Sequence, residues 1–117
     1  MVSVPGLPGR IHPNDLSYVP GHEEHYAYCG QDAIICLEKS LRSAGRDPDS
    51  VERFLDMACG YGRVLRYVRL RWPKARVDAC ELDARALRFC ATEFGVRPIR
   101  SSAHLDRLSF PAAYDLI

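Results

Sequence analysis

The segment FLDMACGYGR, residues 54–63, combines an acidic side chain with a glycine-rich turn. A short buried strand begins this segment, and apolar residues at helical spacing follow it, so the glycines lie at a strand-to-helix turn. Gly60 and Gly62 permit positive φ and let a ligand approach the backbone, whose unpaired N–H groups favour an electron-rich partner. Asp56 would repel a pyrophosphate but suits an ammonium group or a bound water. The segment therefore predicts a ligand-binding loop that disfavours a diphosphate.

A second acidic residue follows at a matching distance. The run from Val77 to Leu82 predicts another strand, and Glu81 falls at its carboxyl end. Ligands of open α/β sheets lie against these ends, and an acid about 20 residues after a glycine turn is placed to accept hydrogen bonds from ribose hydroxyls. Leu82 is then placed to cover an adenine face.

The rest of the pattern predicts the elements that position these residues. We expect a helix from about Glu23 to Ala44, ended by Gly45, and a third strand near residues 96–100. Alternation of strands and helices implies an α/β fold with a parallel sheet and right-handed crossovers. The chain divides into an irregular arm rich in proline and glycine (1–22), a leading helix and linker (23–50), and a core (51–117). The apolar helix faces comprise Ile34, Leu37 and Leu41; Val64, Leu65, Val68 and Trp72; and Ala84, Leu87, Ala91 and Phe94.

These motifs resemble those of class I S-adenosylmethionine-dependent methyltransferases, in particular the group whose first motif is Leu-Asp-x-Gly-Cys-Gly-x-Gly-Arg. The resemblance covers roughly residues 54–117 and implies a Rossmann-like sheet with flanking helices and S-adenosylmethionine as cofactor. Its strand order would be third, second, first, fourth, with Tyr114 to Ile117 opening the fourth strand. By position, the resemblance implies that the cofactor-binding residues are Asp56, Ala58, Cys59, Gly60, Gly62, Glu81, Leu82, Ser102 and Ala103.

Three departures from the family pattern have consequences. Ala58 replaces the first glycine of the motif, which requires that this residue keep a negative φ. Ser102 replaces an acid, so adenine recognition there would depend on a hydroxyl or on backbone groups. The sequence stops at Ile117, where the family's acceptor-binding segment would begin, so we expect a fragment or truncated copy of a longer enzyme. An exposed fourth strand would favour self-association.

The function implied is methyl transfer by the cofactor-binding half of a methyltransferase. No catalytic base can be assigned, and the acceptor remains open between a small molecule, a protein and a nucleic acid. A noncatalytic cofactor-binding fragment is one alternative. An NAD-dependent oxidoreductase is another, but its fingerprint would need glycine or alanine at Leu65, and Asp56 would repel its phosphates.

The composition of the chain limits the functional classes and cellular locations that fit it. The 117 residues suffice for one core, and 16 basic against 15 acidic residues argue against nonspecific nucleic-acid binding. The basic residues from Arg63 to Arg76 are interpreted as a solvated face. We expect a cytoplasmic protein without a membrane segment, because no long apolar run occurs and the odd cysteine count fits reduced thiols.

Several side chains carry a functional and a structural interpretation side by side. His22 and His25 are spaced for one metal ion but lack further ligands at a recognised spacing, so no metal site is predicted. Cys59 is expected to pack beneath the loop rather than act as a nucleophile. His104 lies either at the adenine rim or in an ordinary loop. The tyrosines at the leading helix either contact a ligand or anchor that helix: Tyr18, Tyr26 and Tyr28.

Overall fold

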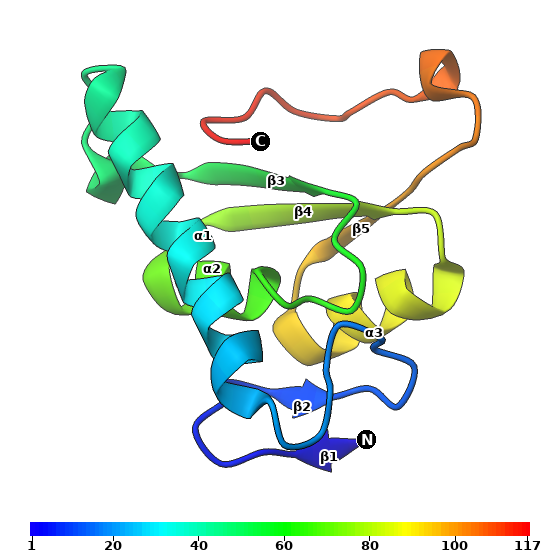
Figure 1. Cartoon of the computed structure of the whole chain (residues 1–117). Helices are drawn as coiled ribbons and strands as arrows, with labels where there is room; N and C mark the ends of the chain where they lie inside the picture. Colours follow the sequence, from blue (N-terminus) through cyan, green and yellow to red (C-terminus); the bar gives the residue numbers. More distant parts are fainter.

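The computed structural model describes all 117 residues and contains a three-stranded parallel sheet with the order β3-β4-β5 (Figure 1). The strands are β3 (Arg53–Met57), β4 (Arg76–Glu81) and β5 (Arg97–Arg100). They alternate with α2 (Leu65–Arg71) and α3 (Ala84–Phe94), and α1 (Glu23–Ser43) packs against α2. Both crossovers run in the same direction across the sheet, and right-handed crossovers of this kind place α2 and α3 on one face. The predicted α/β fold is confirmed.

The fourth strand is present as a single residue pair. Leu116 forms an isolated parallel bridge with Phe54, and the N–H of Leu55 donates to the carbonyl of Leu116 at 2.9 Å. The sheet order is therefore third, second, first, fourth, as predicted. A mostly hydrophobic groove of about 490 Å³ lies beside this edge, between α1 and β3. Self-association through the edge stays a prediction.

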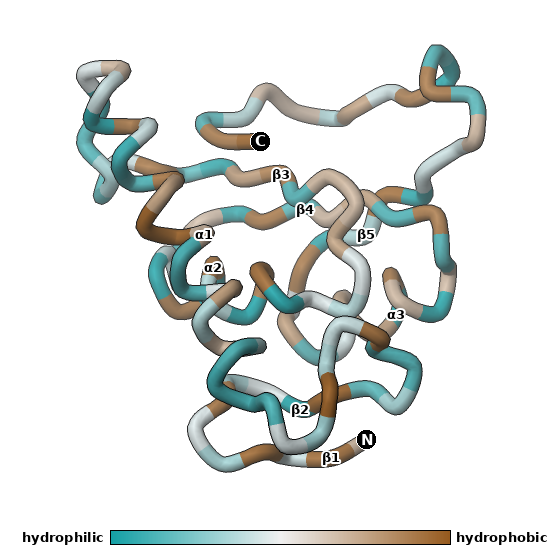
Figure 2. Tube along the Cα trace, viewed as in Figure 1, coloured by the Kyte–Doolittle hydropathy of each residue, from teal (hydrophilic) through white to brown (hydrophobic).

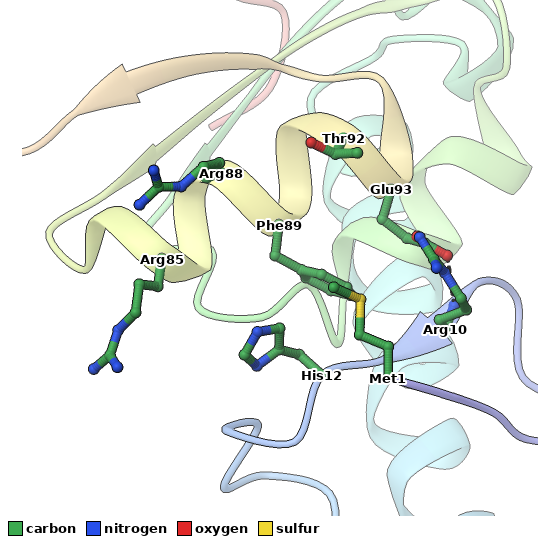
Figure 3. A pocket seen from close by; sticks show the side chains of 8 residues that line it. All are labelled: Met1, Arg10, His12, Arg85, Arg88, Phe89, Thr92 and Glu93. Carbon is green, nitrogen blue, oxygen red and sulfur yellow. Dashed lines mark hydrogen bonds and ion pairs between the residues drawn. The ribbon is translucent and has the colours of Figure 1, made fainter.

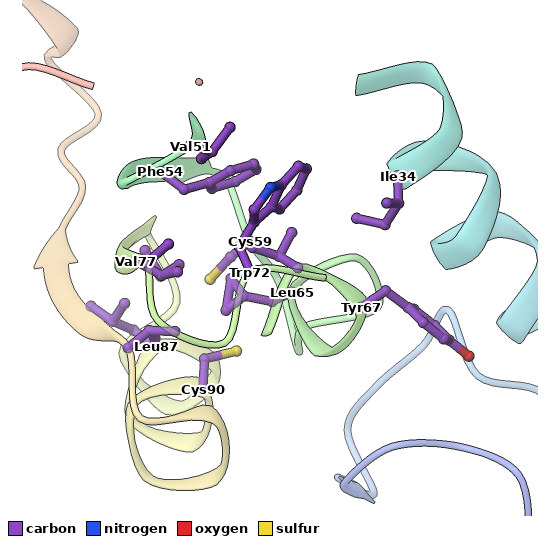
Figure 4. Packing of buried hydrophobic residues seen from close by; sticks show 14 of the residues in the cluster. Ile34, Val51, Phe54, Cys59, Leu65, Tyr67, Trp72, Val77, Leu87 and Cys90 are labelled. Carbon is purple, nitrogen blue, oxygen red and sulfur yellow. The ribbon is translucent and has the colours of Figure 1, made fainter. Parts of the chain in front are cut away.

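The core lies between the sheet and the helices (Figure 4), and α1 alternates hydrophobic and hydrophilic stretches along its length (Figure 2). Ile34 and Leu41 of α1 are buried as predicted, and Leu37 packs against them. None of the helices is both long enough and apolar enough to cross a membrane. The buried cluster includes Phe54, Leu65, Val68, Trp72, Val77, Ala79, Leu87 and Cys90.

The buried face of α3 differs from the predicted one. Its buried residues include Phe89, which the apolar spacing did not include, while Ala84 at the helix start is exposed. The reason is a second packing partner: the ring of His12 lies against Phe89 in an edge arrangement, with centroids 5.3 Å apart. The helix therefore contacts both the sheet and the N-terminal segment.

The N-terminal segment is packed, contrary to the predicted irregular arm. Strands β1 (Val2–Ser3) and β2 (Arg10–Ile11) form an antiparallel pair, and Ile11 is almost fully buried. Arg10 forms an ion pair with Glu93 of α3 at 2.7 Å. Proline and glycine here mark turns within a folded segment rather than an unpacked tail.

Arg66 contradicts the prediction that the basic residues of α2 form a solvated face, because its side chain is buried. Its residue is only 1% exposed, and its guanidinium lies 5.3 Å from the ring centre of Tyr26 and 5.1 Å from that of Phe94. It donates hydrogen bonds to main-chain carbonyls of both the N-terminal segment and the glycine loop. Helical charge periodicity could not distinguish this position from the partly buried Arg63, Arg69 and Arg71.

Gly30 permits the close approach of α1 to α2, and its replacement by alanine tests that contact. An added Cβ would lie 2.4 Å from the Tyr67 ring and 2.6 Å from the main-chain oxygen of Arg63. Glycine to alanine inside a helix normally stabilises by about 1 kcal/mol. Here we expect Gly30→Ala to lower the free energy of unfolding by about 1–3 kcal/mol, because overpacking opposes the gain in propensity.

Urea denaturation measures this change, and Gln31→Ala, at the exposed next position, is the matched control and should change stability little. A stabilised Gly30→Ala variant would contradict the tight packing of α1 on α2.

Candidate functional site

The glycine loop after β3 contains three residues in the left-handed region: Ala58 with φ 61°, Gly60 with φ 54° and Gly62 with φ 84°. The expectation that Ala58 keeps a negative φ is wrong. Its N–H donates to the carbonyl of Cys80 at 2.8 Å, which continues the β3–β4 ladder into the turn and fixes the strained conformation. A left-handed alanine costs roughly 1–2 kcal/mol, which explains why glycine is the usual residue there.

Gly62 and Gly60 differ in what surrounds them. A Cβ at Gly62 would lie 2.5 Å from the ring of Phe94 and 3.3 Å from the Sγ of Cys90, so a side chain does not fit. A Cβ at Gly60 would have no heavy atom within 4 Å. The loop is therefore packed on α3 at Gly62 and open at Gly60, where a ligand can approach its backbone.

Glu81 lies at the end of β4 and accepts a hydrogen bond from the glycine loop. Its Oε2 accepts a hydrogen bond from the N–H of Gly60 at 2.7 Å, and its Oε1 accepts from the N–H groups of Leu82 and Asp83 at 2.7 and 3.0 Å. The carboxylate thus stands beside the loop, as the predicted spacing required. The side chain of Leu82 lies in an exposed position, with 53% of its residue surface accessible.

The carboxyl group of Asp56 forms no hydrogen bond and no ion pair within the protein. Burial, together with the charge of Glu81, raises the pKa of Asp56 to about 6. Two acids therefore face one loop, and ionisation of Asp56 is opposed until a cation joins them. A cationic group is the ligand chemistry that this position favours.

The cysteine of the loop is structural. Cys59 is buried, and its interaction with Cys90 together with burial raises the pKa of its thiol far above the ordinary range. Since the thiolate is the reactive form, the geometry opposes nucleophilic chemistry at Cys59.

Two hollows flank the glycine loop. One, of about 220 Å³, is lined by Asp56, Arg63 and Ser17 together with the loop backbone. The other, of about 540 Å³, lies between residues 13–17 and Gly60. The N-terminal segment therefore forms a wall of both hollows, a role that the predicted irregular arm did not include. The polar Asn-Asp-Leu-Ser run at 14–17 was the only signal for it.

Residues 13–17 are held in place by a buried carboxylate. Asp15 accepts hydrogen bonds from the hydroxyls of Tyr26 and Ser17 at 2.8 and 2.5 Å. Of the three tyrosines near the leading helix, Tyr26 is thus an anchor of that helix. Its pKa is raised because its ring is buried.

The last predicted site residues follow β5. The N–H of Ser101 donates to the carbonyl of Glu81 at 3.0 Å, which places the start of this segment beside the β4 end. Ser102 accepts a hydrogen bond from the N–H of His104, and Ala103 is exposed. The structure thus gathers Asp56, Ala58, Cys59, Gly60 and Glu81 around one loop, while cofactor contacts of Leu82, Ser102 and Ala103 stay predictions.

Comparison with known proteins agrees with this geometry. No family model matches the chain. It is 36% identical over 87 residues to the ribosomal protein uL3 glutamine methyltransferase of Bordetella pertussis, across 69% of this chain and 29% of that protein. Two solved structures of the plantazolicin methyltransferase BpumL, both in complex with SAH (S-adenosylhomocysteine), match 80% of this chain and 38% of theirs. Their TM-scores are 0.57 and 0.54 at 17% and 15% identity.

The chain has the fold of a class I S-adenosylmethionine-dependent methyltransferase. It spans less than a third of the length of its curated relative and 38% of BpumL.

Asp56→Asn tests the electrostatic conflict in the loop. The raised pKa means that the folded state holds a proton more tightly than the unfolded state, so wild-type stability falls as pH rises from about 4 to about 6. Asparagine does not ionise, so the variant should not lose stability in this pH range through this position. We expect Asp56→Asn to be more stable than wild type by about 1–3 kcal/mol at pH 7.5, with a smaller difference near pH 4.5.

Urea titrations at both pH values measure this difference, and Asp106→Asn, at an exposed carboxyl, is the control. A difference for Asp56→Asn that does not change with pH would contradict the assigned conflict.

Proposed function

We propose that this chain is the cofactor-binding half of an S-adenosylmethionine-dependent methyltransferase. The observation that carries the proposal is the placement of two acids, Asp56 and Glu81, at the ends of neighbouring parallel strands on either side of one glycine loop. The open approach at Gly60 fits a ligand that lies against the loop backbone. The likeness to methyltransferases supports the same reading.

The chain's residues have distinct tasks in this proposal. Asp56 attracts the ammonium group of the methionine moiety, and Glu81 accepts hydrogen bonds from ribose hydroxyls. Leu82 covers one face of the adenine, and Ser102 offers a hydroxyl at its edge. The sulfonium of the bound cofactor supplies an activated methyl group, so the protein's contribution here is alignment.

A noncatalytic cofactor-binding module is the second candidate. The chain spans 29% of the curated relative and 38% of BpumL. Both candidate functions require binding of S-adenosylmethionine, but only the first includes transfer of its methyl group. The nicotinamide alternative is disfavoured, because Leu65 is fully buried at the position where the dinucleotide fingerprint needs glycine or alanine.

We further propose that the protein acts in the cytoplasm. All five cysteines are free in the structure. Thiols persist where glutathione and thioredoxin keep them reduced, which supports this location.

Isothermal titration of the chain with S-adenosylhomocysteine is the direct test, with NADH as the control ligand and circular dichroism to verify folding. We expect saturable binding of S-adenosylhomocysteine and none of NADH. A folded chain that binds neither ligand, or binds NADH preferentially, would reject the proposal.

Glu81→Ala tests the ribose contact. Loss of charge-assisted hydrogen bonds of about 1.5–3 kcal/mol should weaken binding of S-adenosylhomocysteine by roughly ten- to a hundredfold. Because the same carboxylate holds the N–H of Gly60, Glu81→Gln, which keeps an oxygen acceptor, separates loop support from charge. Glu24→Ala, at an exposed position of α1, is the control. Unchanged affinity in a folded Glu81→Ala variant would reject the ribose role.

A further inference from the structure

A hollow between α3 and the N-terminal segment carries positive charge that its own residues do not balance. It has a volume of about 290 Å³, with the pair of Arg10 and Glu93 at one end and Arg85 and Arg88 at the other (Figure 3). Glu93 is the only acid that lines it. Its carboxylate accepts hydrogen bonds from the N–H, Nε and Nη2 of Arg10 at 2.7, 2.9 and 2.7 Å. The acid is therefore fully engaged by Arg10, and no acid of the hollow is left for the other two arginines.

Arg85 and Arg88 are exposed cations with little compensation. They lie three positions apart on α3, which places them on the same side of the helix, together with Thr92. The ion pair of Arg85 is a loose one, with Asp83 at 3.9 Å, and that carboxylate already caps α3 by accepting from the N–H of Arg85. Arg88 forms neither an ion pair nor a hydrogen bond. Charges on a helix usually form a solvated face, so the rest of the hollow decides whether these two can bind a ligand.

His12 adds a hydrogen-bond donor whose orientation is fixed. Its ring stacks on Tyr61 of the glycine loop, with centroids 4.6 Å apart, and meets the ring of Phe89 edge-on at 5.3 Å. Its Nδ1 accepts from the N–H of Asn14 at 3.0 Å. The proton of the neutral ring is therefore on Nε2, which bonds no acceptor in the protein. The hollow thus combines an oriented imidazole donor with two guanidinium groups and the hydroxyl of Thr92.

We propose that this hollow binds a phosphate group of a second ligand, distinct from S-adenosylmethionine. Guanidinium groups hold phosphate oxygens through paired, charge-assisted hydrogen bonds. A phosphate has more acceptor oxygens than a carboxylate, so it can use more of the donors gathered here. Arg85 also lines the hollow of about 540 Å³ at Gly60, so the bound phosphate would lie next to the candidate cofactor site. This inference goes beyond the proposed function and does not depend on cofactor binding.

An NMR titration with inorganic phosphate tests the site directly. Heteronuclear spectra follow the Nε–H signals of Arg85 and Arg88 while phosphate replaces chloride at constant ionic strength. We expect saturable shifts of both signals. Arg88→Gln should weaken phosphate binding about three- to tenfold, because it removes charge-assisted hydrogen bonds at an exposed position. Arg107→Gln, at an exposed arginine outside the hollow, is the matched control and should leave the affinity unchanged.

Two further probes identify the source of the phosphate. Ribose 5-phosphate carries a single phosphate, and a single-stranded oligouridylate carries many. Similar affinities for both, each lowered by Arg88→Gln, would assign the hollow to a small phosphorylated ligand. An oligouridylate affinity at least tenfold higher, lowered by Arg88→Gln and by added salt, would assign it to a nucleic-acid backbone. Either result supports a phosphate site.

Three outcomes would overturn the inference. The first is the absence of saturable shifts with all three phosphate probes. The second is the same change in affinity, or none, for Arg88→Gln and Arg107→Gln, because binding would then be nonspecific attraction to positive charge. The third is a glutamate-rich peptide that binds more tightly than the phosphate probes, which would assign the hollow to an acidic protein segment. Each of these leaves the proposed function standing, since titration with S-adenosylhomocysteine tests that separately.

Discussion

The buried guanidinium of Arg66 is the interaction on which the arrangement of the site depends. It donates to the carbonyls of Gly62, Pro8 and Arg10 at 3.1, 2.7 and 3.3 Å, so it joins the glycine loop to the N-terminal segment. A buried charge is costly unless its donors are satisfied. Since these acceptors come from two segments, the charge is accommodated only when both are folded against α2. Aromatic rings of Tyr26 and Phe94 cover its remaining faces.

This link makes the N-terminal segment part of the candidate site. Residues 13–17 wall the hollows on both sides of Gly60, and their position follows from Asp15, which is held by Tyr26 of α1. The leading helix, the segment before it and the glycine loop thus form one hydrogen-bonded unit. A ligand in either hollow would therefore contact both the glycine loop and residues of this wall.

Local pattern predicted much of this structure. The strand, turn and helix around Asp56 and the position of Glu81 followed from apolar spacing and strand ends, because both are set by nearby residues. The burial of Arg66 did not, since its acceptor Pro8 is 58 positions away in the sequence. The φ of Ala58 was also missed, because it is imposed by a hydrogen bond to Cys80 on the neighbouring strand. Tertiary contacts override local preference at these positions.

Two features of the glycine loop are energetically unfavourable. Ala58 occupies the left-handed region, and burial together with the charge of Glu81 raises the pKa of Asp56. The hydrogen bonds from the main chain to Glu81 oppose these costs and hold the loop in place. They leave the repulsion between the acids unrelieved. A cationic ligand would relieve part of that repulsion, so the two acids favour an ammonium group over a neutral group at this position.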